Sequence, residues 1–152
     1  MKQYEAEIAI AGPVQEVFDF FADMTRMAEW APEDFIQVDR LDTGPVTKGS
    51  RFEFITRGAK ARSVFTWVAF DPGRELEFYG PRLDVGPGWV EGRGGYRFNR
   101  RGSDTVVTAW FEPTLGGFLR LMSPFARMRN KRLLPHQLAR AKQLIESRTR
   151  AK

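Results

Sequence analysis

The chain has 152 residues, of which 42% are hydrophobic and 28% charged, and its formal net charge is +5. This length is enough for one domain with its own core, and the composition excludes a disordered chain. No run approaches the roughly 20 apolar residues that span a bilayer, and the N-terminal residues lack the apolar segment of a secretory signal. We therefore expect a single domain over residues 1–152, located in the cytoplasm.

The lack of cysteine and the single histidine, His136, narrow the chemistry further. Disulfides, thiol nucleophiles and thiolate metal sites are excluded. The sequence also lacks a nucleotide-binding glycine loop, a zinc-protease motif and a serine nucleophile elbow. We expect no metal and no cofactor, and we interpret His136 as a solvated or capping residue rather than a catalytic one.

Hydrophobic periodicity predicts a strand and two short helices in the first 30 residues. Residues 3–10 alternate between apolar and polar side chains, which is typical of a half-buried strand. Residues 13–22 have apolar side chains at steps of three and four, which favours an amphipathic helix opened by Pro13. Asp23 can cap a second short helix, which should end near Trp30 because Pro32 disfavours helix just before it.

The middle of the chain predicts about six more strands, separated by turns rich in glycine and proline. We expect turns at residues 58–61 and 71–73, a loop around residues 80–88, and an end to the sheet at Pro113. The predicted strands begin or lie at residues 36–38, 51–57, 62–70, 75–79, 89–100 and 105–112.

Beyond Pro113 the apolar spacing becomes helical almost to the C-terminus. Pro124 should break this helix and Pro135 should kink it, since each lacks a backbone donor and crowds the preceding turn. The order of strand, two short helices, strands and long helix indicates an α+β domain.

Several motifs in this order resemble the SRPBCC superfamily, which includes START lipid-transfer domains and the birch-pollen-allergen fold. The polyketide cyclase/dehydrase and lipid-transport group is the most similar. The motifs are residues 10–18 with Gly12-Pro13, 27–30 ending in Trp30, 44–50 from Gly44-Pro45 to Gly49-Ser50, 70–76 with Asp71-Pro72-Gly73, and the hairpin 96–108 with Gly102-Ser103-Asp104.

The resemblance implies a helix-grip fold, in which a curved antiparallel sheet of about seven strands wraps around a long C-terminal helix. In this fold two short helices close one end of an apolar cavity that binds a lipid, a polyketide or a similar molecule. A bent sheet cannot seat flush on a straight helix, and glycines such as Gly92, Gly94 and Gly95 permit such a bend.

Aromatic residues make up 13% of the chain, which suggests a lined cavity, although a solid core is the alternative. Tyr96 and Arg82 are the catalytic candidates, because either could polarise a ligand carbonyl. Further polar candidates are Thr56, Tyr79, Arg62 and Glu112, and the faces of Trp89 and Trp110 stay unassigned. The residues expected to line the cavity are Phe52, Phe54, Phe65, Trp67, Leu76, Phe78, Tyr96, Phe98, Met122, Phe125 and Met128.

The positive charge is concentrated at the C-terminus. Residues 115–152 carry ten Lys/Arg and one acid, whereas the rest of the chain carries 14 basic and 18 acidic residues. We interpret the basic segment as a solvated helix face. Nucleic acid is not the expected partner, because no aromatic residues are interleaved beyond Phe125. Transient contact with an anionic membrane and formation of a homodimer stay open.

The sequence therefore predicts a protein that binds a hydrophobic small molecule such as a lipid or polyketide, and it leaves open whether that molecule is also transported. The alternative is a polyketide cyclase, aromatase or dehydratase whose cavity folds a flexible ligand into reactive geometry. A third hypothesis is a module that contacts membranes or nucleic acid through the basic helix. Whether the protein is an enzyme is left open by the sequence.

Overall fold

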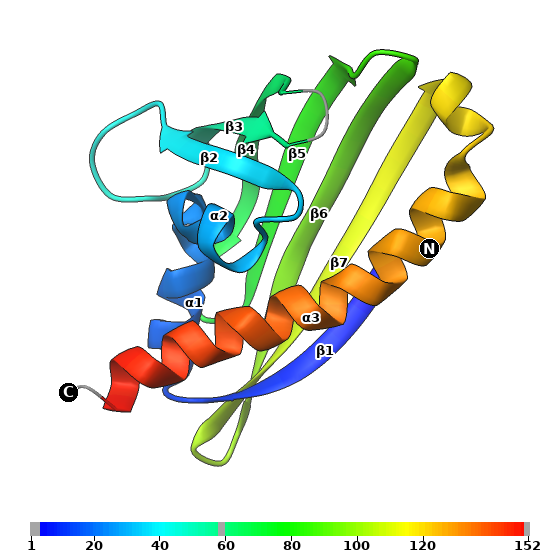
Figure 1. The fold of residues 1–152 in the computed structure, drawn as a ribbon. Coiled ribbons are helices and arrows are strands. Elements are labelled where there is room, and N and C mark those ends of the chain that lie inside the picture. Colours follow the sequence, from blue (N-terminus) through cyan, green and yellow to red (C-terminus); the bar gives the residue numbers. More distant parts are fainter. Residues whose placement is uncertain (1–3, 58–59, 151–152) are drawn as a thin grey trace.

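The computed structural model describes residues 4–57 and 60–150, which form one curved seven-stranded sheet with a long helix across it (Figure 1). All strand pairs are antiparallel, in the order β1-β7-β6-β5-β4-β3-β2. The expected α+β helix-grip architecture is confirmed. The elements are β1 Tyr4–Ala11, α1 Val14–Ala22, η1 Met24–Arg26, α2 Met27–Trp30, β2 Phe35–Arg40, β3 Arg51–Thr56, β4 Arg62–Asp71, β5 Glu75–Asp84, β6 Gly88–Arg101, β7 Asp104–Gly117, η2 Phe118–Arg120 and α3 Ser123–Arg150.

The first helices follow the predicted local signals. Pro13, predicted as the first helical residue, is instead the N-cap, with an extended backbone immediately before Val14. The Asp23 carboxylate accepts a hydrogen bond from the Thr25 backbone amide at 3.1 Å and so caps η1. The short α2 then ends at Trp30, as expected.

Two strands run further than predicted. β5 continues through Gly80 and Pro81 to Asp84, where a loop was expected, and its pairing with β6 shifts register between Gly80 and Leu83. Such a bulge accommodates a residue without an amide donor. β7 passes through Pro113, paired with Gly92, and ends at Gly117. Because an antiparallel ladder bonds only alternate residues to one neighbour, a single proline removes at most one ladder bond.

The C-terminal helix α3 is continuous from Ser123 to Arg150, so the predicted break at Pro124 is wrong. Pro124 lies in the first turn, where backbone amides have no intrahelical acceptor and a proline removes no bond. The helix also continues through Pro135. The turn predicted at residues 58–61 includes residues 58 and 59, which lie outside the described part of the chain.

The solid core lies where α1 packs on the sheet. The Phe18 ring stands edge-on to the rings of Phe70 and Phe98, each 5.2 Å away between centroids. The Trp67 indole donates a buried 3.1 Å hydrogen bond to the Ala22 carbonyl at the end of α1. Side chains beneath α1 are therefore fully packed. The part of the inner sheet face that α1 does not cover borders a cavity.

Candidate functional site

A cavity of about 700 Å³ lies between the sheet, the segment joining α2 to β2, and the middle of α3. This volume is within the range of about 300–1,000 Å³ that small-molecule sites occupy. Its lining is mostly apolar and comes from many elements. Lining residues include Tyr4, Met24, Met27, Trp30, Phe35, Phe54, Thr56, Ser63, Phe65, Phe78, Pro81, Leu83, Val85, Val90, Tyr96, Ala109, Phe111, Leu133 and Leu134.

Six aromatic side chains form a continuous band along the sheet side of this cavity. Successive ring centroids lie 4.5–6.5 Å apart, most of them in edge-to-face or tilted arrangements. This spacing is the one that aromatic pairs prefer. The aromatic band consists, in order across the sheet, of Phe35, Phe54, Phe65, Phe78, Phe111 and Tyr4.

Strand glycines give these rings their space. A Cβ on Gly80 would lie 1.9 Å from Cε1 of Phe65, and a Cβ on Gly94 would lie 2.7 Å from Cζ of Phe78. Neither distance is compatible with a methyl group, so each ring occupies the space that a side chain at the glycine would fill. The sequence prediction gave Gly94 the role of permitting a bend, and the structure adds this second role.

Two buried polar side chains, Trp30 and Tyr96, lie at the cavity wall. Trp30 is 3% exposed, and its indole Nε1 is buried without a hydrogen bond among the described residues. Tyr96 is 5% exposed, and burial alone raises the pKa of its phenol. The two rings are 6.4 Å apart between centroids. The Tyr96 phenol therefore stays protonated at neutral pH, so the wall carries two N–H or O–H donors.

A polar cluster borders the cavity where the segment after α2 meets α3. The Asp34 carboxylate pairs with Arg129 at 3.0 Å and accepts a 2.9 Å hydrogen bond from Gln137. The Glu33 carboxylate pairs with Arg140 at 2.9 Å. The side-chain hydrogen bond from Arg140 holds the pKa of Glu33 below its ordinary value. Both acids are therefore occupied in joining the loop to the helix.

Four of the eleven residues expected to line the cavity do so: Phe54, Phe65, Phe78 and Tyr96. Four others face the interior but belong to the solid core. Phe52, Trp67, Leu76 and Phe98 are 0–4% exposed and are not part of the cavity wall. Their predicted place in the lining is wrong because α1 covers that half of the sheet, as the bond from Trp67 to Ala22 shows.

The three residues predicted from the C-terminal helix are on the outside. Met122, Phe125 and Met128 are 43%, 70% and 59% exposed. Helical spacing indicates an apolar face but not what that face contacts, so this prediction is also wrong. The α3 residues that do line the cavity all come after Met128: Arg129, Asn130, Leu133, Leu134 and Gln137.

Arg82, the other catalytic candidate, lies at the surface. Its guanidinium stacks over the Trp89 ring at 4.5 Å and is 3.8 Å from the Asp84 carboxylate. The register shift after Gly80 removes the strand parity on which an inward Arg82 depended. Trp89, whose face the sequence left unassigned, also packs against the backbone of Gly116.

Of the remaining polar candidates, only Thr56 lines the cavity. The other three lie away from it, and each has a polar partner: Tyr79 donates to Glu91 at 2.6 Å, Arg62 pairs with Glu53 at 2.7 Å, and Glu112 lies 3.7 Å from Arg93. Trp110 pairs across the sheet with Gly95 and Glu5, with the Arg93 guanidinium 5.6 Å from its ring centroid.

The sequence prediction missed Tyr4, Trp30, Phe35 and Phe111 as lining residues. A signal existed for two of them. Tyr4 has the parity of the buried Ile10 in its strand, and Phe111 has the parity of the buried Ala109. Trp30 and Phe35 flank a loop whose path the sequence did not specify.

Over residues 4–57 and 60–150, no cluster of His, Asp and Glu has the arrangement of a metal site. The helices in the described part of the chain include none with the length and apolarity to cross a membrane.

The family model for "Polyketide cyclase / dehydrase and lipid transport" matches residues 1–146. The chain belongs to this family, as the resemblance of its motifs implied. No curated protein matches the sequence significantly.

Solved structures of low sequence identity share the fold over most of the chain. TTHA0849 from Thermus thermophilus is 16% identical with a TM-score of 0.76, and the alignment covers 94% of this chain and 96% of that one. The Zhui aromatase/cyclase from Streptomyces sp. R1128 is 20% identical with a TM-score of 0.66, covering 97% and 95%. The di-domain ARO/CYC StfQ from the steffimycin biosynthetic pathway is 16% identical with a TM-score of 0.69, covering 96% of this chain and 51% of StfQ.

Proposed function

We propose that the protein binds a hydrophobic small molecule, of the lipid or polyketide class, in the 700 Å³ cavity and carries it. The main support for this proposal is the cavity itself, with the aromatic band on one side and two buried donors, the Trp30 indole and the Tyr96 phenol, in its wall. Membership of a family that includes lipid transport supports the same function.

The lining suggests the shape of the guest. The aromatic band offers a broad apolar surface to a flat or flexible hydrocarbon, because aromatic rings contribute both area and preferred stacking geometry. The Trp30 indole and the Tyr96 phenol can each donate a hydrogen bond to a carbonyl or hydroxyl oxygen of that guest. A ligand with an apolar body and one oxygen-bearing end matches this arrangement.

Native mass spectrometry of the protein purified from its own host tests the proposal, because it measures the mass of any ligand that co-purifies with the protein. The matched variant is Ala109→Leu, which adds a larger side chain to the cavity wall, where Ala109 is 2% exposed. We expect wild type to carry an added mass and this variant to lose most of it while remaining folded. The control, Val68→Leu, changes a 40% exposed side chain outside the lining and should keep the added mass.

An absence of bound mass in wild type, together with no saturable uptake of fatty acids or aromatic polyketides in solution, would refute the proposal. Equal loading of the Ala109→Leu variant would place any bound molecule elsewhere on the protein.

A second candidate is catalysis on the same guest, as a cyclase or aromatase. One observation favours it: the buried Tyr96 hydroxyl is at the cavity wall, and its raised pKa suits a donor that polarises a carbonyl rather than a base. The names of two neighbours, an aromatase/cyclase and a di-domain ARO/CYC, agree with this chemistry.

The test is turnover of a poly-β-ketone thioester to an aromatic product, followed by absorbance. If Tyr96 acts in the reaction, the Tyr96→Phe variant should bind the substrate within a few fold of wild type but lose about 100- to 1,000-fold in rate. Equal loss of binding and rate would assign Tyr96 to binding alone, and no turnover in wild type would leave carriage as the function.

A further inference from the structure

Five large apolar side chains are exposed on η2, on the turn that follows it and on the start of α3. Leu121 and Phe125 are 74% and 70% exposed, and the other three are 43–59% exposed. Exposed apolar residues scattered singly need no explanation, but a contiguous group marks an interaction surface. We call this group the apolar stripe: Phe118, Leu121, Met122, Phe125 and Met128.

The members of the apolar stripe recur at steps of three, one, three and three residues. Backbone hydrogen bonds from the Leu121 amide to the Phe118 carbonyl and from the Phe125 amide to the Met122 carbonyl give this segment helical turns. Residues at such steps share one face of a helix. The cavity-lining residues of α3 begin at Arg129, directly after Met128, and none of the stripe residues is among the lining. The stripe is therefore not part of the cavity wall, and no described element covers it.

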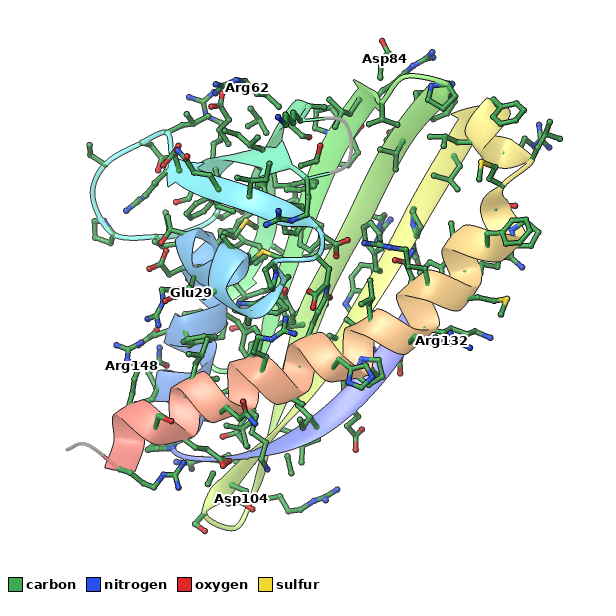
Figure 2. The ribbon with its side chains drawn as sticks, viewed as in Figure 1. Glu29, Arg62, Asp84, Asp104, Arg132 and Arg148 are labelled. Atoms are coloured by element: carbon green, nitrogen blue, oxygen red, sulfur yellow. The ribbon has the colours of Figure 1, made fainter. Side chains whose placement is uncertain are left out.

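Basic residues surround the stripe without acidic ones. Residues 115–132 contain five Lys/Arg and no Asp or Glu. Arg129 is paired with Asp34. The structure gives no ion pair for the other four, Arg120, Arg127, Lys131 and Arg132, within its described residues. Figure 2 shows Arg132 projecting from α3 on the side away from the sheet.

We propose that the segment 118–132 docks on an anionic membrane surface, with the apolar stripe in the lipid interface and the four unpaired cations near the headgroups. A helix with Phe and Leu on one face and Lys and Arg beside it has the composition that lies in a membrane interface. The charge selects an anionic bilayer, because the cytoplasmic leaflet attracts clustered Lys and Arg. Figure 1 shows this start of α3 at the far end of the sheet from α1, where it is free to meet a surface.

This inference goes beyond the proposed function and does not depend on it. A bilayer bound at the stripe would contact the start of α3, and later residues of α3 form part of the cavity wall. The arrangement would therefore bring the wall of the cavity to the surface from which an apolar guest leaves or enters.

Co-sedimentation with vesicles tests the docking. One set of vesicles is phosphatidylcholine alone, and the other mixes phosphatidylcholine with phosphatidylserine. We expect wild type to bind the mixed vesicles and to be released by salt, because screening weakens contacts between exposed charges. Two paired variants separate the contributions: Leu121→Ser with Phe125→Ser for the stripe, and Arg127→Gln with Lys131→Gln for the charges.

Each pair should weaken binding by about tenfold or more, since apolar burial and charge act together at an interface. The controls are Ile36→Ser with Val68→Ser, which are 41% and 40% exposed on other elements, and Arg100→Gln with Arg101→Gln at the far hairpin. Both controls should bind as wild type does. Unchanged urea midpoints would show that the stripe variants are folded.

Three results would overturn the docking proposal. The first is no binding of wild type to the mixed vesicles. The second is a stripe variant that binds as tightly as wild type. The third is a wild-type dimer that the stripe substitutions convert to a monomer, which would assign the stripe to a second copy of the chain. If wild type bound the mixed vesicles but carried no added mass in native mass spectrometry, only the proposed ligand binding would be refuted.

Discussion

The Gly80→Ala substitution tests whether the aromatic band needs the space that the missing side chain of Gly80 provides. Gly80 is buried in β5, and its φ is outside the left-handed region, so alanine can adopt its backbone conformation. The new Cβ would lie 1.9 Å from Cε1 and 2.3 Å from Cδ1 of Phe65. Since carbon atoms pack at about 3.5–4.0 Å, the Phe65 ring must move by about 1.5–2 Å.

The cost of this movement can be estimated. The Phe65 ring is held by Phe54 and Phe78, with centroids 4.5 Å and 5.2 Å away. Forcing an added methyl group into such packing costs about 1–3 kcal/mol. In a Phe65→Val background the same substitution should cost nothing, because valine lacks the Cδ1, Cε1 and Cζ atoms that meet the new Cβ. It should even gain about 0.5–1 kcal/mol, since glycine weakens a strand interior.

The assay is a double-mutant cycle measured by urea unfolding, followed by tryptophan fluorescence. We expect a coupling energy of about 1.5–4 kcal/mol between the two sites, with an unchanged denaturant slope. The explanation would be refuted if Gly80→Ala cost the same with valine and with phenylalanine at position 65.

The remaining predictions concern charge and core. The folded-state pKa of Glu33 is lowered, so its pairing with Arg140 stabilises the protein above the unfolded pKa of about 4.5 and is lost as pH falls through the folded value. The stability difference between wild type and Glu33→Gln, measured by urea unfolding, should therefore be present at pH 7 and disappear in acid; a difference that grows in acid would contradict this. Trp67→Phe removes the buried bond to Ala22 and should cost about 1–3 kcal/mol while leaving ligand loading unchanged. Loss of loading in a folded Trp67→Phe protein would show that Trp67 contacts the guest after all.

The sequence predicted the order of elements because period-2 and helical patterns are local properties. It failed at Pro81, Pro113 and Pro124 for a shared reason. Whether a proline ends an element depends on whether its missing amide had an acceptor, and bulges, pairing register and helix position decide that. None of these can be read from the residues beside the proline.

The candidate site was predicted in part for a similar reason. Strand parity placed Phe54 and Phe98 correctly on the inner face, but it does not tell which stretch of that face a helix covers. Phe98 lies under Phe18 of α1, whereas Phe54 borders the cavity. In the same way, helical spacing could not show that the part of α3 before residue 129 does not contact the cavity. Phe125 is therefore exposed to solvent.

The position of Trp30 allows ligand binding to be followed by intrinsic tryptophan fluorescence. Its indole is buried at the cavity wall without a hydrogen-bond acceptor among the described residues, so an arriving guest would change the polarity around this fluorophore directly. A conjugated guest would also absorb light at the wavelengths where indole emits. Titrations of candidate compounds can therefore be read from intrinsic emission, without a dye or a label, and a Trp30→Phe protein supplies the blank.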